Sequence, residues 1–290
     1  MKYRIVLRKL YEKITSDELN ILLSLLLLLI IIVVVPTVIL GGYGKRGFLE
    51  SIWANVNTMV IELLILGIIL KLLTKVSSKR KEIQQYLNEI DNSRFWNDQN
   101  AARRIRKCIT SLNQLGISQI DLNNCYISNA QLEGVTLVDS NLWKANFEEC
   151  DLENSDLQKS DFWSANLKGA VLRRANLSDA NLDSCILTKA DLSGAILKDA
   201  CLKNSTLLDA DLTDSILDNA DLTGVKGISP LQLSKAKSAI NIKADDKLLD
   251  KARSIKPNLF EIVGTKSVSG DQSGDNSNIR IYSADNKEME

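Results

Sequence analysis

Hydrophobic residues recur at every fifth position, without interruption, from Leu122 to Leu222. Each of these 21 positions holds Leu, Ile or Phe, and the position two residues earlier holds a small or aliphatic residue such as Ala, Ser, Cys, Val or Ile. The other three positions are mostly Asp, Asn, Ser, Thr, Lys and Glu. Side chains repeat about every 3.6 residues in an α-helix and every 2 in a strand, so neither element explains this period. The pattern predicts a closed coil of short straight segments.

One large and one small apolar position in every five residues suit one side of a narrow tube, with the large residues stacked in columns inside it. Such an interior has little spare volume, so we expect the large residues to pack tightly between neighbouring coils. The residues predicted to form this structural core are Leu142, Leu152, Leu157, Leu167, Leu172, Leu177, Leu182, Leu187, Leu192 and Leu197.

Several units, such as "ADLSG", "ANLSD" and "ADLTG", match the pattern A(D/N)LXX closely. The segment 117–226 therefore resembles the pentapeptide repeat family over about 105 residues. The resemblance implies an all-β repeat fold, a right-handed four-sided β-helix with four units per coil. The units of this chain are enough for about five coils.

Helical signals flank the repeat, where a stacked tube needs caps to cover its unpaired edges. On the N-terminal side, an amphipathic run starts at Asp98, a good N-cap residue, and stops at Gly116. On the C-terminal side, Ser229 and Gln232 have the spacing of a capping box. The expected segments are an N-terminal cap helix at 98–116, a C-terminal helical cap at 227–263 and a flexible tail at 264–290.

Two apolar runs precede the repeat and predict two transmembrane α-helices. The first is nearly uninterrupted over about 20 residues, the length that crosses a hydrocarbon core, whereas the second contains Glu62 and Lys71. Basic residues precede the first run and follow the second, so both termini and the repeat are expected in the cytoplasm of a bacterial cell, with the hairpin in its inner membrane. A cleaved signal peptide is the alternative for the first run. The expected segments are a basic amphipathic stretch at 1–19, helices at 20–40 and 56–76, an external loop at 41–55 and a basic linker at 77–97.

The chain carries 36 basic and 36 acidic side chains, but residues 121–226 contain 18 Asp or Glu against 9 Lys or Arg. There is no histidine, and no nucleophile, phosphate-loop or zinc motif occurs. The five cysteines lack C-x-x-C spacing, and four of them occupy positions that other units give to small residues. The aspartates before the central leucines are expected to face solvent. We therefore predict no catalytic, cofactor-binding or metal-binding residues.

Trp143 and Trp163 stand one residue after a core position and 20 residues apart, so they should stack on one face of neighbouring coils. Exposed aromatic residues on a rigid surface often anchor a protein partner. The alternative is a ladder that stabilises the face. The pair Arg173 and Arg174 is interpreted as part of a solvated face. The basic residues of the cap helix are interpreted as attracted to anionic lipid or to the acidic tube.

These features predict a non-enzymatic, membrane-anchored scaffold that presents an acidic β-helix to a protein partner. Nucleic acid binding is not expected, because the tube itself is acidic. Some pentapeptide-repeat proteins resemble B-DNA in width and charge and bind type II topoisomerases, so DNA mimicry is the alternative. A further alternative is a small transporter or channel subunit, with Glu62 in its ion or proton pathway.

Overall fold

The computed structural model describes residues 48–260, which divide into two compact units at the boundary between Asn88 and Glu89. The amphipathic stretch at 1–19, the first apolar run at 20–40 and the tail at 264–290 lie outside the described residues.

A single 46-residue helix, α2 (Phe48–Ser93), contains the second apolar run. It runs through part of the expected loop at 41–55 and through most of the expected linker at 77–97. No helix within residues 48–260 is both long and apolar enough to cross a membrane.

The prediction of two transmembrane helices is therefore wrong. A spanning helix needs about 20 predominantly apolar residues, and in α2 Glu62 and Lys71 divide the apolar run before a polar C-terminal half begins. The first predicted helix is in the part of the chain that is not described. The multi-pass membrane location depended on both helices and is not supported.

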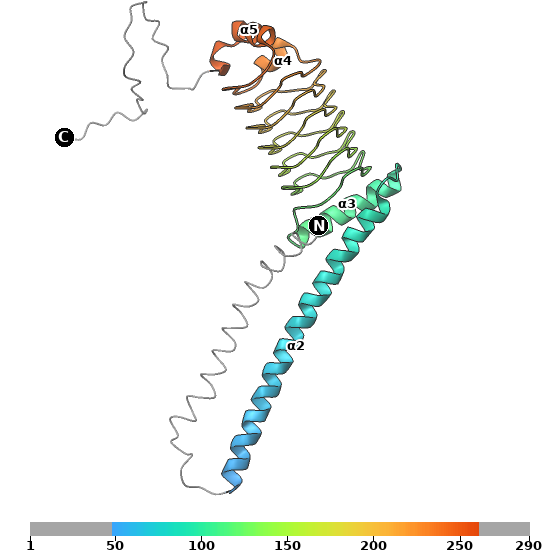
Figure 1. The fold of residues 1–290 in the computed structure, drawn as a ribbon, viewed down its shortest axis with the longest axis vertical. Helices are drawn as coiled ribbons and strands as arrows, with labels where there is room; N and C mark the ends of the chain where they lie inside the picture. Colours follow the sequence, from blue (N-terminus) through green and yellow to red (C-terminus); the bar gives the residue numbers. More distant parts are fainter. Residues whose placement is uncertain (1–47, 261–290) are drawn as a thin grey trace, which may run out of the picture. The chain divides into compact units, whose positions relative to one another are not determined.

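The repeat segment is a stack of coils (Figure 1), in which parallel bridges join residues that are 20 apart, from Asp121 with Asn141 to Thr206 with Lys226. Twenty residues per coil correspond to four five-residue units. Within a unit, the Cys125 N–H donates to the Leu122 carbonyl at 3.0 Å and closes a turn. Between coils, the Leu122 N–H donates to the Asn141 carbonyl at 2.7 Å.

The ladders consist of isolated bridges, and no strand occurs between residues 48 and 260. A turn follows each short straight side, so an extended run is too short to become a strand. The second residue after each central position has a positive φ, for example Asn124 at 54° and Lys144 at 54°. Asn, Asp and Gly favour this left-handed region, and they occupy most of these positions.

All ten leucines predicted to form the core are fully buried. Phe147 and Phe162 take two of the large positions inside the tube, with ring centroids 5.9 Å apart. Small residues such as Ala175 and Ala180 are buried two positions before the central leucines. The five-residue pattern therefore maps directly onto a continuous interior.

The first coil is preceded by α3 (Gln99–Gln114), which lies against it in Figure 1. Asp98 is the N-cap and accepts hydrogen bonds from the Asn100 and Ala101 N–H groups. The buried face of α3 contains Ile105, Ile109 and Leu112, as the helical spacing predicts. Gly116 follows with a φ of 82°.

The C-terminal cap consists of α4 (Pro230–Ser234), α5 (Asp246–Ile255) and the short helix η1 (Pro257–Phe260). Ser229 and Gln232 form the predicted capping box at the start of α4. The chain then pairs again with the last coil: Ile216 bridges to Ser238, and Asp221 bridges to Lys243. This additional pairing covers part of the last coil.

Candidate partner-binding surface

Trp143 and Trp163 lie on one face of neighbouring coils and form a compact aromatic pair. Their ring centroids are 5.1 Å apart with the planes tilted by 34°. The Lys144 Nζ lies 4.7 Å from the Trp143 centroid and 5.4 Å from the Trp163 centroid. Trp143 is 39% exposed. We call Trp143, Lys144 and Trp163 the tryptophan patch.

Side-chain hydrogen bonds along the neighbouring column hold the backbone of the patch. The Trp163 N–H donates to the Asp161 Oδ1 at 3.1 Å, and the Asn181 Nδ2 donates to the same oxygen at 2.9 Å. In the preceding coil, the Asn141 Nδ2 donates to the Asp121 Oδ1 at 3.0 Å. The patch is therefore positioned by both the main-chain ladder and a ladder of Asp and Asn side chains.

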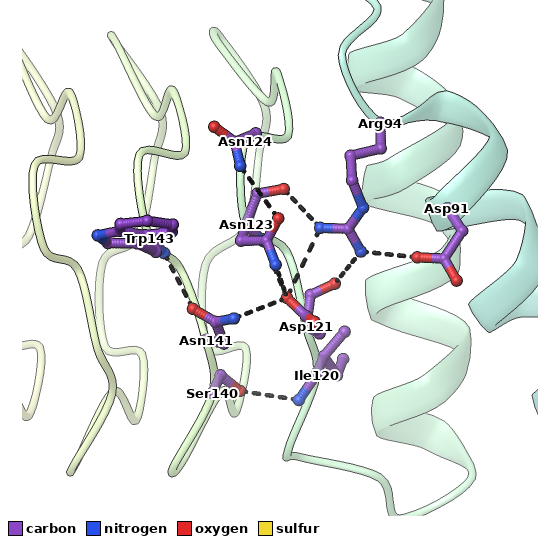
Figure 2. Close-up of polar contacts among 9 residues, drawn as sticks. All are labelled: Asp91, Arg94, Ile120, Asp121, Asn123, Asn124, Ser140, Asn141 and Trp143. Carbon is purple, nitrogen blue, oxygen red and sulfur yellow. Dashed lines mark hydrogen bonds and ion pairs between the residues drawn. The ribbon is translucent and has the colours of Figure 1, made fainter. Parts of the chain in front are cut away.

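Arg94, the residue after α2, links Asp91 in the last turn of α2 to the edge of the first coil (Figure 2). Its Nη1 donates to the Asn123 carbonyl at 2.5 Å, and its Nη2 donates to the Asp121 carbonyl at 3.2 Å and to the Asp91 Oδ1 at 2.6 Å. In later coils, the equivalent carbonyls accept hydrogen bonds from the coil before. The Arg94 side chain thus supplies the hydrogen-bond donors that a preceding coil would supply.

The Arg94 side chain is only 11% exposed. Burial lowers the pKa of Arg94, but hydrogen bonding to Asp91 and the nearby charge of Asp121 outweigh this effect and raise it. The guanidinium therefore remains charged. Sequence reasoning missed this role, because Arg94 lies in the expected linker and its only sequence signal is a cation close to the start of the repeat.

Ion pairs also join side chains about one coil apart. Arg173 and Arg174 both pair with Glu153, and the Arg173 Nη1 lies 3.5 Å from Asp191 Oδ2. This arginine pair, predicted to lie on a solvated face, is 47% and 65% exposed and also belongs to an ion-pair cluster. Two further inter-coil pairs are Lys168 with Glu148 at 2.9 Å and Lys203 with Asp221 at 3.3 Å.

These pairs shift carboxyl pKa values in one direction. The hydrogen bond from Arg173 lowers the pKa of Glu153, and the hydrogen bond from Lys168 lowers the pKa of Glu148. Both carboxylates are thus stabilised in their charged form.

Three of the four cysteines of the repeat, Cys125, Cys150 and Cys185, are buried inside the tube, and Cys201 is partly exposed. Burial raises the pKa of Cys125, Cys150 and Cys185 to about 12. A thiol is nucleophilic and ligates metals as the thiolate, so these residues are poorly suited to either task at neutral pH. Within residues 48–260, no group of acidic or thiol side chains has the arrangement of a metal site.

A family model described as pentapeptide repeats matches eight copies across 118–226. Residues 118–226 are pentapeptide repeats. The match includes the whole five-residue pattern from Leu122 to Leu222. A search of curated proteins found no match.

Solved structures similar to part of this chain include HetL, a pentapeptide repeat protein involved in heterocyst differentiation regulation from the cyanobacterium Nostoc sp. strain PCC 7120. HetL is 26% identical, and the match covers 44% of this chain and 66% of HetL with a TM-score of 0.35. This chain therefore spans slightly less than two thirds of HetL.

Two other solved structures are also similar to part of this chain. Rfr23 from the cyanobacterium Cyanothece 51142 is 25% identical, with 42% of this chain and 88% of Rfr23 covered and a TM-score of 0.33. QnrB1, a plasmid-mediated fluoroquinolone resistance protein, is 16% identical, with 50% and 84% covered and a TM-score of 0.22.

Proposed function

We propose that this pentapeptide-repeat protein is a non-enzymatic scaffold, a right-handed four-sided β-helix that binds a protein partner through the tryptophan patch. The observation that carries the proposal is the Trp143 and Trp163 pair, with centroids 5.1 Å apart on an outward position of the coil. Other units place Asp, Lys, Thr or Ser at this position, so the fold does not require an aromatic residue there.

The tryptophan patch is preorganised for binding. Trp is enriched at binding hot spots because a large rigid ring is buried with little loss of side-chain entropy. The rings here are held on a backbone fixed by Asp161 and Asn141, so a partner would order few additional side chains. Lys144 supplies one charged group beside the rings. A partner with an apolar centre and an acidic neighbour fits this patch.

The test replaces both tryptophans, W143S/W163S, and compares the proteins crosslinked to the full chain in cells. We expect the variant to lose a specific partner that the wild-type chain recovers. Its melting temperature should change little, because outward substitutions usually alter stability by less than about 0.5 kcal/mol.

The matched control is I186S/L208S, which removes two other exposed apolar residues, 45% and 49% exposed, from a different face of the coils. This control should recover the same partner as the wild-type chain. An unchanged set of partners in W143S/W163S, together with a lower melting temperature, would instead assign the tryptophans to stabilising the face. In that case the pair would contribute about 0.5–1.5 kcal/mol beyond its buried area.

DNA mimicry is a second candidate, favoured by the charge of the repeat. Residues 121–226 contain 18 acidic and 9 basic residues. Several of the basic residues, such as Arg173, Lys168 and Lys203, pair with acids of neighbouring coils. The acidic excess therefore remains on the surface, where it would attract a protein surface that binds DNA.

A supercoiling assay with a type II topoisomerase separates the two candidates. DNA mimicry predicts that micromolar full-length protein inhibits or protects the enzyme, and that added salt weakens this effect. W143S/W163S should then behave as the wild-type chain. Absence of any effect on the enzyme would eliminate this candidate and leave the scaffold proposal untouched.

A further inference from the structure

A pocket of about 290 Å³ lies between α3 and the first coil. Two of its lining residues, Ala102 and Ala130, are small and buried, which leaves depth between the helix and the coil. Its remaining lining residues are polar or basic and come from both sides. They are Gln99, Arg103 and Arg106 of α3 and Asn129 and Gln131 of the first coil.

The basic residues of the pocket share one face of α3. Arg103 follows Gln99 by four residues and precedes Arg106 by three, which is the spacing of neighbours on a helix surface. Neither arginine forms an ion pair within residues 48–260. Arg104 lies outside the pocket lining, and its Nε is 3.9 Å from Glu89 Oε1. Two guanidinium groups are therefore available to a ligand in the pocket.

The first coil contributes an open backbone donor. In the second coil, the Asp151 N–H donates to the Ala130 carbonyl of the first coil at 2.9 Å. Gln131 occupies the same position one coil earlier, and its N–H has no acceptor in the described part of the chain. One unit later, α3 supplies an acceptor in place of a carbonyl from a preceding coil: the Thr136 N–H donates to Asn113 Oδ1 at 2.8 Å. Among residues 48–260, no side chain accepts from the Gln131 N–H in this way.

We propose that this pocket binds the phosphate group of a small phosphomonoester. Two guanidiniums can each donate a pair of hydrogen bonds to an oxyanion, and the Gln131 N–H adds a donor from the opposite wall. Three such groups suit the three terminal oxygens of a phosphate better than the two of a carboxylate. A volume of about 290 Å³ leaves room for a small organic part beside the phosphate.

Several acidic side chains of the second coil have other partners. Asp151 accepts a hydrogen bond from the Glu153 N–H at 3.0 Å, and Glu148 pairs with Lys168. Neither they nor Glu149 forms an ion pair with Arg103 or Arg106 within residues 48–260. The positive charge of the pocket is therefore not cancelled by a direct partner.

The test is isothermal titration calorimetry of the full chain with phenyl phosphate and, separately, inorganic phosphate. R103Q/R106Q should raise the dissociation constant for phenyl phosphate by at least about tenfold, since each lost bond to a charged group contributes on that scale. The matched control R104Q changes an arginine of the same helix outside the pocket and should bind as the wild-type chain does.

Melting temperatures of all variants accompany the titration. If R103Q/R106Q melts lower than the wild-type chain, R103K/R106K provides the same test, because lysine keeps the charge and loses the paired hydrogen bonds. Equal weakening in R104Q, or no binding of phenyl phosphate at millimolar concentration, would overturn the proposal. Binding of inorganic phosphate as tight as that of phenyl phosphate would overturn the assignment of a phosphomonoester. W143S/W163S should retain phenyl phosphate binding, which keeps this site distinct from the partner surface.

Discussion

Arg94 shows how one side chain can complete a backbone ladder. A stacked coil leaves carbonyls unpaired at its first edge, and Arg94 donates to two of them, those of Asp121 and Asn123. Asp91 holds the guanidinium from the other side. Removing a donor from partly buried acceptors has a larger cost than the net value of one hydrogen bond, because the acceptors lose water as well.

The first prediction is that Arg94→Met lowers the free energy of unfolding by about 1–3 kcal/mol, the cost of leaving buried acceptors unsatisfied. Methionine keeps much of the apolar stem, so packing changes little. Thermal or urea unfolding of the full chain measures this effect. Lys107→Met, an exposed residue of α3, is the control and should unfold as the wild-type chain does. A change no larger than that of the control would show that water replaces the guanidinium.

The second prediction concerns pH and the Glu153 carboxylate. Because the hydrogen bond from Arg173 lowers its pKa, the folded state binds a proton less readily than the unfolded state. Its contribution to stability is present above the unfolded pKa of about 4.3 and is lost as the pH falls through the lower folded value. Glu153→Gln should therefore lower the melting temperature at pH 7 and flatten its decline below about pH 4.5.

Glu133→Gln serves as the control for this experiment, because Glu133 occupies the same column one coil earlier and forms no ion pair in the described part of the chain. Melting curves between neutral and acidic pH should superimpose for Glu133→Gln and the wild-type chain. Parallel curves for Glu153→Gln and the wild-type chain would contradict the predicted linkage.

At the scale of the element, the five-residue unit is stabilised by its neighbours above and below. The straight side of a unit is too short for a strand, so each unit contributes one bridge and one buried leucine to the stack. Its turn hydrogen bond is local, but its ladder hydrogen bonds join it to residues 19 to 21 positions away. A unit in the middle of the stack therefore depends on both adjacent coils.

The third prediction is that Leu177→Ala lowers the free energy of unfolding by about 2–5 kcal/mol, through lost burial and a cavity that the rigid coils cannot close. Leu177 is fully buried in the middle of the stack. Urea unfolding followed by circular dichroism measures the change. Ser178→Ala, the next residue and an outward position, is the control and should change stability by less than about 0.5 kcal/mol. Equal effects of the two substitutions would mean that the interior can repack.

For the whole molecule, the repeat is a stack whose ends are covered by different devices. At the C-terminal end, the Gln232 Nε2 donates to the Leu207 and Ala210 carbonyls at 3.1 and 3.0 Å. Gly227 lets the chain leave the last coil, since a Cβ there would lie 2.9 Å from the Leu208 Cβ and its φ is 75°. Stacked coils with uncovered edges pair readily with other chains.

The fourth prediction is that truncation after Gly227 makes the protein self-associate, because it removes α4, α5 and the bridges at Ser238 and Lys243. Light scattering after size exclusion should report a larger apparent mass than for the intact chain. Truncation after Phe260 keeps the cap and is the control. If the truncated protein contains the same number of chains per particle as the control, the exposed edge does not pair with another chain.

The sequence alone was sufficient to predict the repeat, its buried leucines and the N-caps Asp98 and Ser229. Each of these depends on neighbours within a few residues: the period of five sets which side chains point inward, and a cap needs only the next turn. The same local reasoning failed for α2, where an apolar run was interpreted as a membrane span although Glu62 and Lys71 interrupt it.

Only the tertiary structure determined which surface groups meet. Arg94 reaches a carbonyl 29 residues away, and Arg173 reaches Glu153 across one coil. The pocket beside Arg103 and Arg106 exists because α3 lies against the first coil. Such contacts depend on how coils stack and on how the cap docks. The amino-acid pattern sets the period that makes stacking possible, but many charged residues share the same outward positions, and the pattern does not select among them.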